Sequence, residues 1–582
     1  MKASNYIAEF FAQRGVTHIF GYIGGMITHL VDSIDQNAKV SFIQTYHEQT
    51  ASIAAEGYAL ETGLFGVAIC TSGPGVTNMM TGIADAYFGS IPVIYISGQV
   101  NSYEYKYDKP IRQQGFQEME VVNVVKPITK YAVLLDNPEK IRYELEKAVY
   151  LATTGRKGPV VIDLPMDVSR AEIDPEKLLP FVPDREKSSV FSKSENLSEV
   201  FDLLRNAERP MMLIGGGCTG ARNLIESFLK KTKMPVVTSL MGRGLYNEEY
   251  SNHVGMLGSY GNRCANMAVS QADLLVVLGS RLDTRQTGAR FQGFLANRKI
   301  IHVDIDENEL ICHRLKNRVQ VHMTVQDFLE MLLKKELAYK NYNQWNAWIQ
   351  SVKTTYSQDN EIARFVENKS PYLFFQELNK AMCENDIVCV DVGQNQMWAA
   401  QTLKLKKNQR FSCSGGLAPM GYALPAAIGF AFANPQKKVY CIVGDGGFHM
   451  SVQSMLLISQ YRLNITVVVL NNSSLGMITQ FQHLYFNDRM AGTTPQGGYF
   501  VPDLKKMAES YAFPYYQMSA DSLDNTVLCR SGFSLVDYRI ENLTTVSPKL
   551  EYNQPIERPS PQIPDQELEE CFMRLANGIN RA

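Results

Sequence analysis

The stretch VYCIVGDGGFHMSVQSMLLI, residues 439–458, joins an apolar run to a helix-like pattern through glycines clustered around Asp445. Gly444, Gly446 and Gly447 cost backbone order, which is tolerated where something must approach the main chain closely. A strand end followed by glycines and a helix start is a natural anion site, because free N–H groups and the helix dipole point outward. A carboxylate at such a site makes sense if a cation lies between it and the anion. The stretch therefore predicts a phosphate site with a metal ion.

A second strand end brings a matching polar residue to the same place. After Gly446, a helix-like segment at 448–463 and the strand-like NITVVVLNN lead to Asn472, with 25 residues between Gly446 and Asn472. A β–α–β unit returns its second strand beside the first, so Asp445 and Asn472 are expected at the sheet edge where ligands bind. Carboxylate and amide oxygens suit Mg²⁺ that also touches phosphate. GDGG alone, or an Asn pair alone, is also common as a simple turn.

The composition excludes several classes of protein. The 582 residues carry a net charge near −2, with 45% hydrophobic and 20% charged residues, as in ordinary globular proteins. The balanced charge gives no electrostatic reason to expect nucleic acid or an anionic membrane as a partner. No apolar stretch reaches the roughly 20 residues that span a bilayer. The N-terminus lacks a signal-peptide core and the ten cysteines form no CxxC pair, so we expect a cytoplasmic protein.

Short apolar runs alternate with helical patterns along the chain, which is typical of parallel sheets covered by helices. A polar stretch at 181–196 without periodicity is interpreted as a linker, and a second polar stretch near 340–368 precedes the third segment. The Pro-rich end is expected to run extended over the surface. The fold class is therefore α/β, with three consecutive domains and mostly parallel sheets, at 1–180, 190–340 and 365–547, followed by a tail at 548–582.

The GDG motif followed after about 25 residues by NN resembles the diphosphate-anchoring motif of thiamine-diphosphate (ThDP) enzymes. By that resemblance Asp445 and Asn472 bind Mg²⁺, and the backbone carbonyl of Ser474 completes the protein ligands. The three glycines around Asp445 would then hold the diphosphate of the cofactor. The segment at 365–547 is accordingly expected to be the diphosphate-binding domain.

A ThDP enzyme needs a carboxylic acid at the aminopyrimidine ring, and burial would raise the pKa of that acid to suit proton transfer. Glu48 follows a strand-like run and starts a helix, where an acid can also serve only to stabilise the helix dipole. However, HEQTASIAAEGYALETG and TSGPGVTNMMTGIADAY resemble the pyrimidine-domain motifs of the acetolactate synthase branch. The resemblance makes Glu48 the catalytic glutamate, places Pro74 and Asn78 near the pyrimidine, and adds Phe116 and Gln117 to the catalytic set.

Two further motifs of the third segment resemble the same branch. SCSGGLAPMGYALPAAIG is similar to its thiazolium loop, in which Met420 would prop the cofactor in a bent shape. VDVGQNQMWAAQ supplies Gln394 and Asn395 near the diphosphate, and Met477 belongs to the same cofactor set. The usual His at the second of these positions is Asn395 here, which still forms hydrogen bonds but cannot become cationic.

The middle segment resembles the FAD-binding domain of that branch through IGGGCTG, SLMG, GMLGSYG, GSRLDTRQTG and HVDIDENE. The flavin of this branch is structural rather than a redox participant. A lone glycine-rich turn could serve packing only, and no full GxGxxG with its acid supports a flavin or nicotinamide oxidoreductase. The residues that the resemblance implies for FAD are Arg156, Gly215, Gly216, Gly217, Met256, Arg281 and Asp304.

The acceptor side departs from the family pattern. Arg285 matches the position that grips the carboxylate of a second 2-keto acid, as a bidentate arginine can, although a flavin-phosphate or surface contact is the plainer alternative. Phe481 replaces a family Trp that shapes the acceptor pocket, and Met166 replaces a Lys near the active site. GSYGNRCAN is about three residues longer than the usual form.

The resemblance implies a carboligase dependent on ThDP, Mg²⁺ and FAD. It would decarboxylate pyruvate and transfer the acyl carbanion to a second carbonyl, with 2-acetolactate as the default product. A keto-sugar nucleotide or another aldehyde or ketone is the alternative acceptor, because the tail resembles proteins of surface-polysaccharide pathways. A catalytically silent partner protein is the rival from another class. Glu48 and the diphosphate site must meet across an interface, so we expect a homodimer or homotetramer, with a possible regulatory subunit.

Overall fold

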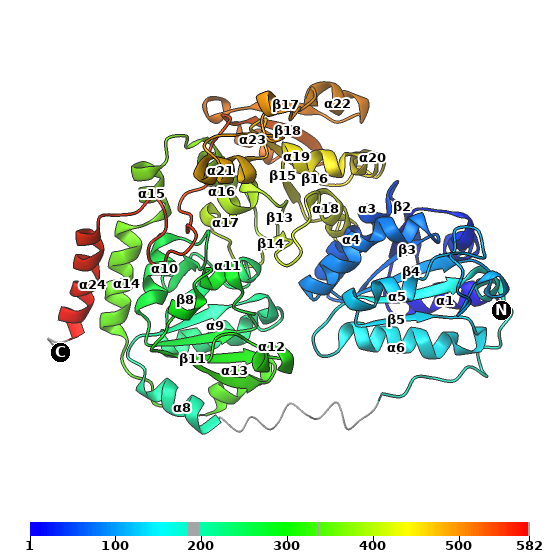
Figure 1. Ribbon diagram of the computed structural model, residues 1–582, viewed down its shortest axis with the longest axis horizontal. Coiled ribbons are helices and arrows are strands. Elements are labelled where there is room, and N and C mark those ends of the chain that lie inside the picture. Colours follow the sequence, from blue (N-terminus) through cyan, green and yellow to red (C-terminus); the bar gives the residue numbers. More distant parts are fainter. Residues whose placement is uncertain (184–196, 336, 580–582) are drawn as a thin grey trace.

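The computed structural model describes residues 1–183, 197–335 and 337–579, and it arranges them as three α/β domains (Figure 1). Each domain is built on one six-stranded parallel sheet. The predicted fold class is therefore confirmed. Most of the connection expected at 181–196 lies outside the described residues.

The first domain places a sheet between helices in the strand order β2-β1-β3-β4-β6-β5. Its strands are β1 (His18–Gly21), β2 (Ser41–Gln44), β3 (Gly66–Cys70), β4 (Val93–Gln99), β5 (Tyr131–Leu134) and β6 (Val160–Pro165). Its helices are α1 (Ala3–Gln13), α2 (Thr28–Asp35), α3 (Glu48–Thr62), α4 (Pro74–Gly89), α5 (Val121–Val125), α6 (Ile141–Thr153) and α7 (Met166–Arg170). The central strand β3 is buried along its whole length, as expected for a sheet covered on both faces.

The middle domain has the strand order β12-β11-β10-β7-β8-β9. Its strands are β7 (Pro210–Ile214), β8 (Val236–Thr238), β9 (His253–Met256), β10 (Leu274–Leu278), β11 (Lys299–Asp304) and β12 (Arg318–His322). Its helices are α8 (Leu197–Asn206), α9 (Arg222–Thr232), α10 (Arg263–Gln271), α11 (Thr284–Thr287), α12 (Glu307–Ile311) and α13 (Val325–Lys334).

The third domain has the strand order β14-β13-β15-β16-β18-β17. Its strands are β13 (Ile387–Val390), β14 (Arg410–Cys413), β15 (Val439–Gly444), β16 (Ile465–Asn471), β17 (Tyr515–Met518) and β18 (Ser534–Arg539). Its helices are α16 (Ser370–Ala381), α17 (Gln394–Thr402), α18 (Ala423–Ala433), α19 (Asp445–Met450), α20 (Met455–Gln460), α21 (Gly476–Tyr485), α22 (Leu504–Ser510) and α23 (Asn525–Leu528).

The polar stretch near 340–368, to which the sequence assigned no structure, is mostly helical. It forms α14 (Asn343–Thr355) and α15 (Gln358–Phe365). Trp345 and Trp348 lie on one face of α14 and are buried, and the Trp345 indole N–H donates to the Pro210 carbonyl oxygen at 2.9 Å. These two large side chains fix the helix to the middle domain, whereas its other face supplies the polar residues.

The tail is also more structured than its proline content indicated. Residues 565–579 form α24 (Asp565–Ile579), which packs beside α14 (Figure 1). The preceding segment is irregular, but it contributes Leu550, Ile556 and Ile563 to the hydrophobic core of the middle domain. The tail is thus a part of that core, not a strand of chain laid over the surface.

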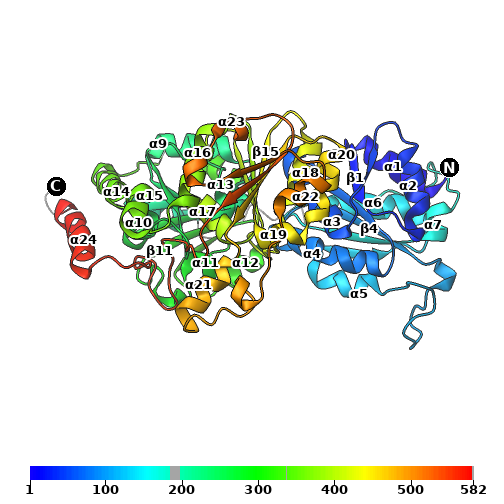
Figure 2. The ribbon, with the colours of Figure 1, turned by 90° about the horizontal axis from the view of Figure 1, so that it is seen from above.

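Two helices join the first and third domains at very short range. Helices α3 and α18 lie side by side in both views (Figures 1 and 2). A Cβ added to Gly57 would collide with the carbonyl oxygen of Ala426, and one added to Gly429 would collide with that of Ala54. The two glycines therefore allow backbone contact between the helices, which fixes how the two domains face each other. Among the described helices, none has the length and apolarity required to cross a membrane.

Candidate functional site

The parallel pairing of β15 with β16 brings the GDG and NN motifs to one sheet edge. Gly444, the last residue of β15, pairs with Leu470 of β16. Asp445 then starts α19, and Asn472 follows the last residue of β16. Because both strands end at the same edge, the two polar side chains lie beside each other at the carboxyl end of the sheet.

The Asp445 carboxylate is buried with only neutral partners. Its Oδ1 accepts the hydroxyl proton of Tyr499 at 2.6 Å, and its Oδ2 accepts the backbone N–H of Ser473 at 2.8 Å. The side chain is 1% exposed, and burial raises its pKa to about 6. No ion pair with a described residue offsets its charge. A buried carboxylate without a cationic side chain is a site that a metal ion would stabilise.

The neighbouring oxygen atoms suit Mg²⁺. The Asn472 Oδ1 accepts the Ser474 N–H at 3.2 Å, and its amide donates to Gln394 Oε1 at 3.3 Å. Gln394 is itself fixed by donating to the Thr544 carbonyl oxygen at 2.7 Å. The buried Ser474 hydroxyl has no hydrogen-bond partner among the described residues. Carboxylate, amide and carbonyl oxygens gathered at one edge form the hard-oxygen donor set that Mg²⁺ prefers, so these residues fit the metal.

Two glycines of this edge let neighbouring side chains pack directly against the main chain. A Cβ on Gly446 would lie 2.7 Å from the Leu475 side chain, 3.0 Å from the Tyr499 hydroxyl and 3.2 Å from the Met420 methyl. A Cβ on Gly447 would lie 3.1 Å from the Asp391 carboxyl. The start of α19 thus carries no side chain of its own at Gly446 and Gly447, which suits a diphosphate bound by its backbone N–H groups.

Met420 is held at this edge by a buried acid. Asp391 accepts the N–H groups of Gly421 at 3.0 Å and of Ala423 at 3.3 Å, and burial raises its pKa to about 7. Asn395 donates to the backbone carbonyl of the same Asp391 at 2.7 Å. The cofactor residues expected from sequence thus converge here, together with Met477 at the start of α21.

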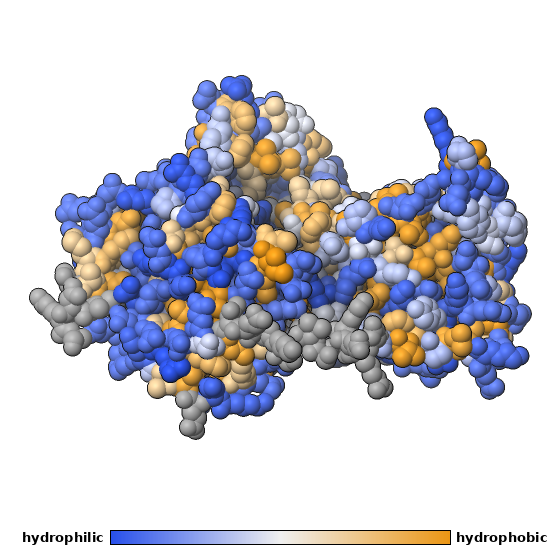
Figure 3. All heavy atoms as spheres, turned by 60° about the horizontal axis from the view of Figure 1, so that its bottom comes forward, coloured by the Kyte–Doolittle hydropathy of each residue, from blue (hydrophilic) through white to orange (hydrophobic). Residues whose placement is uncertain are grey.

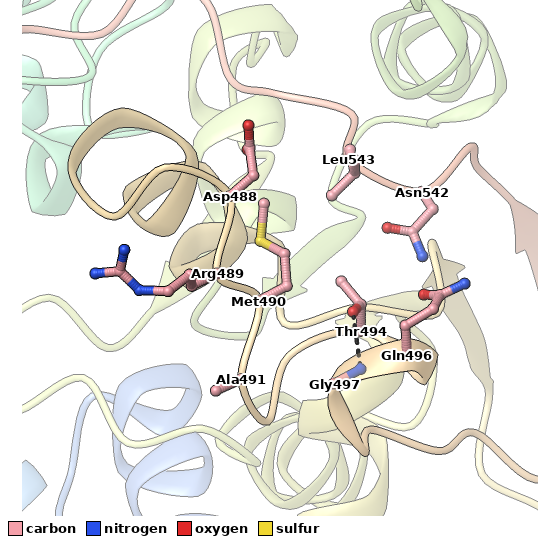
Figure 4. A pocket seen from close by; sticks show the side chains of 9 residues that line it. All are labelled: Asp488, Arg489, Met490, Ala491, Thr494, Gln496, Gly497, Asn542 and Leu543. Carbon is pink, nitrogen blue, oxygen red and sulfur yellow. Dashed lines mark hydrogen bonds between the residues drawn. The ribbon is translucent and has the colours of Figure 1, made fainter.

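A pocket of about 620 Å³ opens beside this edge (Figure 4). The segment before Tyr499 and the chain that follows β18 form its walls, and Thr494 Oγ1 accepts the Gly497 N–H at 3.3 Å. Its lining residues are Asp488, Arg489, Met490, Ala491, Thr494, Gln496, Gly497, Asn542 and Leu543. The same chain after β18 carries Thr544, so the pocket shares a wall with the diphosphate edge.

Glu48 is the first residue of α3, and His47 caps the helix by accepting the Gln49 N–H. The Glu48 side chain is 6% exposed, and its Oε2 accepts the Asn78 amide at 3.0 Å. Its Oε1 lies 3.4 Å from the position of a Cβ on Gly75, next to Pro74 at the start of α4. The sequence-predicted pyrimidine residues Glu48, Pro74 and Asn78 therefore form one cluster.

Phe116 and Gln117 lie close to this cluster. The Gln117 carbonyl oxygen would be 2.8 Å from a Cβ on Gly73, just before Pro74, whereas the Phe116 ring is 80% exposed. The buried Glu118 carboxylate fixes the segment by accepting three backbone N–H groups, those of Lys106 at 2.7 Å, Gln114 at 2.6 Å and Gly115 at 2.8 Å. Phe116 thus projects into solvent from a loop that is fixed by these three hydrogen bonds.

On the acceptor side, Arg285 is exposed and forms no ion pair with a described residue. The longer GSYGNRCAN segment is hydrogen-bonded to the backbone of Arg285, because the Ser259 N–H donates to the Arg285 carbonyl oxygen at 2.6 Å. The charge of Arg285 acts on nearby Tyr260 and on Cys413, which precedes the loop bearing Met420. Phe481, 47% exposed, packs against Tyr485 with ring centroids 4.7 Å apart and ring planes tilted by 53°.

Met166, where the family has a Lys, is the first residue of α7 and is partly buried. It follows β6 directly, at the carboxyl edge of the first sheet. No electrostatic role is open to a thioether at this position, so a Lys function cannot be carried over to it.

In the middle domain, three consecutive glycines, Gly215 to Gly217, differ in how tightly their surroundings are packed. A Cβ on Gly215 or Gly217 would collide with Gly279, so these two allow the turns after β7 and β10 to touch. A Cβ on Gly216 would meet Met241, 3.2 Å from its side chain and 3.7 Å from its carbonyl oxygen, so Gly216 is the least tightly packed of the three. Asp304, at the end of β11, accepts the Asp306 N–H at 2.9 Å, and burial raises its pKa.

Two other residues expected at the flavin lie along the same edge. Arg281 follows β10 and is 3.9 Å from Asp283, and Met256 ends β9 with its N–H bonded to the Asn262 side chain at 2.9 Å. Gly216, Arg281 and Asp304 follow neighbouring strands and offer a backbone turn, a cation and an acceptor, which fits a dinucleotide. The buried Thr238 hydroxyl at the end of β8 has no partner among the described residues, which adds a free donor there.

Arg156 has other partners in this structure. Its Nη1 pairs with Asp306 at 2.9 Å and Glu309 at 2.7 Å, and its Nε donates to Ser90 at 3.0 Å. These bonds tie the first domain to the middle one. Arg156 would have to exchange carboxylate partners to reach a flavin phosphate.

The structure does not bring the two halves of the expected site together within the described chain. No hydrogen bond or ion pair between described residues joins Glu48 to Asp445 or Asn472. The nearest bond is that of Thr50 with Ser454, 3.1 Å apart, between α3 and the turn after α19. Sequence reasoning missed Tyr499, which lies outside the quoted motifs, and it missed the role of Asp391, although Asp391 is the second residue of VDVGQNQMWAAQ.

Three family models match the chain in the order of its domains. They describe the N-terminal thiamine pyrophosphate (TPP) binding domain at 1–124, the central domain at 197–332 and the C-terminal TPP binding domain at 391–537 of thiamine pyrophosphate enzymes.

Curated relatives match over nearly the full length. The acetolactate synthase large subunit of Lactococcus lactis subsp. lactis is 36% identical over 88% of this chain and 88% of its own. The probable acetolactate synthase large subunit of Methanocaldococcus jannaschii is 36% identical over 88% and 86% of the two chains. The acetolactate synthase isozyme 2 large subunit of Escherichia coli is 34% identical over 94% and 97%. With these matches and the geometry above, the chain belongs to the thiamine pyrophosphate enzyme family, in its acetolactate synthase large-subunit branch.

Proposed function

We propose that this protein is a ThDP-dependent carboligase that decarboxylates pyruvate and joins the acyl group to a second carbonyl compound, with 2-acetolactate as the product when that compound is pyruvate. The names of the three curated relatives described above, each of which contains the words acetolactate synthase large subunit or isozyme 2 large subunit, support this assignment. The observation that carries it is the buried, unpaired Asp445 carboxylate beside the Asn472 oxygen, at the edge where the family binds its cofactor.

When bound, ThDP would supply a carbon that adds to the keto carbon of pyruvate and accepts the electrons released with CO₂. The residues of this chain would bind the metal ion and the diphosphate, orient the cofactor and supply a proton to its pyrimidine ring. Asp445, Asn472 and the Ser474 carbonyl would hold Mg²⁺, and Gly446 with Gly447 would admit the diphosphate to the backbone. Met420, fixed through Gly421 by Asp391, would support the centre of the cofactor.

Glu48 would hold the proton that the pyrimidine ring requires. Its Oε2 already accepts the Asn78 amide, so the proton of the neutral acid would reside on Oε1. Burial of the Glu48 side chain keeps water away from the transfer. Retention of this acid and of Asp445 argues against a catalytically silent protein.

Arg285 would bind the carboxylate of the acceptor, because it is an exposed arginine free of ion pairs with described residues, close to Tyr260 and the Cys413 end of the Met420 segment. Phe481, smaller than the family Trp, leaves the acceptor pocket wider. That difference keeps a second candidate acceptor, a keto-sugar nucleotide or another aldehyde or ketone.

FAD would occupy the carboxyl edge of the middle sheet as a structural cofactor, supported by Gly216, Arg281 and Asp304. Purified protein should then carry flavin without any need for its reduction. Activity in flavin-free buffer from protein with no flavin absorbance would contradict this assignment.

The active site would form between two copies of the chain, as homodimer or homotetramer, with a possible regulatory subunit. Apolar side chains are interspersed with hydrophilic ones over the first domain, at the right of Figure 3, and exposed Tyr87, Phe88, Phe116 and Val124 belong to that domain. Mixing inactive Glu48→Gln with inactive Asp445→Ala subunits should restore partial activity, because a mixed dimer holds one intact site. Mixtures that stay inactive although the subunits exchange would place both half-sites in one chain.

Product analysis tests the function directly. The purified protein would be incubated with ThDP, Mg²⁺, FAD, labelled pyruvate and a panel of acceptors, and the products identified by mass spectrometry. Labelled acetolactate is the expected product. CO₂ release without acetolactate, but with a labelled adduct of another carbonyl compound, would transfer the assignment to the second candidate acceptor.

A further inference from the structure

The segment that carries Met420 lies where all three domains meet. Residues 414–422, here the Met420 loop, connect β14 to α18 (Figure 1). A Cβ on Gly416 would lie 2.7 Å from the Phe88 side chain of the first domain, and one on Gly415 would collide with the Met241 sulfur of the middle domain. The conformation of this loop is therefore set by neighbours outside its own domain.

The C-terminal end of the loop is fixed from within the third domain. Asp391 accepts the Gly421 N–H with both carboxylate oxygens, at 3.0 and 3.1 Å. Gly421 has a φ of +85°, which suits glycine, so the turn and the acid together determine where Met420 ends.

The N-terminal end is fixed from the first domain instead. The Ser414 hydroxyl donates to Asp85 Oδ1 at 2.5 Å, and Ser414 Oγ accepts the Ala418 N–H at 3.0 Å. Asp85 lies on α4 and is 3% exposed. One buried carboxyl of the first domain thus orders the loop through a single hydroxyl.

Behind Asp85 lies a second buried acid. Glu56 is fully buried on α3, its carboxyl lies within hydrogen-bond reach of the Asp85 carboxyl, and neither of its oxygens meets any other donor among the described residues. Burial raises the pKa of Glu56 well above its usual range, with Asp85 adding to the effect, and burial also raises the pKa of Asp85 to about 6. No described cation pairs with either group. Two such carboxyls are compatible with burial when one proton lies between them.

We propose that Asp85 and Glu56 share a proton and that Asp85 is a positioning residue, which holds the Met420 loop from the first domain through Ser414. The inference rests on the proposed function only in what the loop supports, a ThDP site. Helix α3 carries both Glu48, at its first residue, and Glu56. It would therefore connect the acid that serves the pyrimidine to the Met420 loop, which shapes the cofactor site in the third domain of the same chain.

Hydrogen–deuterium exchange of the 414–423 peptide, in the full-length protein without ligands, tests the positioning. Ser414→Ala should speed exchange in this peptide about tenfold, as expected for loss of one hydrogen bond. Asp85→Ala should do the same. Asp85→Asn should restore slow exchange, because its amide oxygen accepts from Ser414 and its amide N–H donates to Glu56 in place of the shared proton.

The Ser414→Ala/Asp85→Ala double variant should exchange no faster than the faster single variant, since both remove one contact. Ser97→Ala is the matched control. It breaks a similar buried bond in the first domain, from Ser97 to Asp163 at 3.0 Å, and should leave the 414–423 peptide unchanged. Three results would each overturn the proposal. The increases in exchange rate of the two single variants could add up in the double variant, Ser97→Ala could speed exchange of the 414–423 peptide equally, or Asp85→Asn could exchange as fast as Asp85→Ala.

Calorimetry with ThDP and Mg²⁺ gives a second readout. Ser414→Ala should weaken ThDP binding severalfold while the thermal midpoint of the apo-protein stays near that of the parent. Faster exchange of the 414–423 peptide in Ser414→Ala without any change in ThDP affinity would overturn the role of the loop as a cofactor support. If the parent itself binds no ThDP, the proposed function fails, whereas the exchange result still decides whether Asp85 positions the loop.

Discussion

At the scale of single residues, the site depends on acids buried without cations. Asp445 has two neutral partners, and the Tyr499 hydroxyl and the Ser473 N–H aim its carboxylate oxygens. Such an arrangement costs stability in the free protein and is repaid when a metal binds. Tyr499 lies outside the glycine motif, yet its hydroxyl group helps to orient the Asp445 carboxylate within that motif.

Asp445→Ala should abolish Mg²⁺-dependent ThDP binding, because it removes the only carboxylate of the expected donor set. Titration calorimetry with ThDP and Mg²⁺ measures this. Tyr499→Phe is the graded comparison, since it keeps the carboxylate but removes one charge-assisted hydrogen bond, worth about 1.5–3 kcal/mol. An unchanged ThDP affinity in Asp445→Ala would rule out this anchor.

Arg285→Lys should weaken use of a 2-keto acid acceptor by about 1–3 kcal/mol, because lysine keeps the charge but loses the fork that matches two oxygens. Pyruvate decarboxylation should stay near the parent rate. Phe481→Trp should shift preference toward a larger 2-keto acid such as 2-ketobutyrate, by restoring the wide aromatic face. Competition assays with mixed 2-keto acids report both effects, and unchanged product ratios in both variants would argue against a 2-keto acid acceptor.

At the scale of helices and strands, periodicity and spacing predicted the parts that depend on local order. The 25-residue spacing from Gly446 to Asn472 requires a β–α–β unit, and the paired strands β15 and β16 follow from it. Tyr499 could not be found in this way, because it reaches Asp445 from an irregular segment 54 residues further along the chain. The helices α14 and α15 were missed because their sequences are mostly polar, and the two tryptophans on the buried face of α14 become informative only against the middle domain.

The contact of α3 with α18 gives a prediction at this scale. Gly429→Ala should destabilise the protein by about 1–3 kcal/mol, the usual penalty for forcing atoms into a filled interface, because its methyl would collide with the Ala54 carbonyl. Thermal unfolding measures the loss. Gly293→Ala is the matched control, since nothing lies within 4 Å of its added Cβ, and equal stability of the two variants would contradict backbone contact between the helices.

At the scale of the whole molecule, the tail and the middle domain form one unit. Arg263 is buried in an ion pair with Glu361 at 2.7 Å, and it also donates to the carbonyl oxygens of Pro559 at 3.1 Å and Pro561 at 2.6 Å. Trp348 donates to the Cys571 carbonyl at 3.0 Å. The sequence could not predict this, since a proline-rich segment without periodicity gives no sign of what it packs against.

A chain ending at residue 547 should therefore lose much of the stability of its middle domain. Leu550, Ile556, Ile563, Leu568 and Leu575 are buried in that core, and each buried apolar side chain contributes about 1.5–3 kcal/mol. Thermal unfolding with exchange measured in 263–271 would report the loss. A chain ending at 579 is the control, and equal protection of 263–271 in both would show that the tail is dispensable.

The contribution of the tail also has a consequence for the order in which the polypeptide is synthesised. The sheet of the middle domain emerges from the ribosome by residue 322, yet the residues that close its core lie from 550 onward. The third domain must therefore be translated in full while the middle domain still exposes the surface of α10 and α14. Until residues 550–575 emerge, this apolar surface stays open to aggregation or to binding by a chaperone.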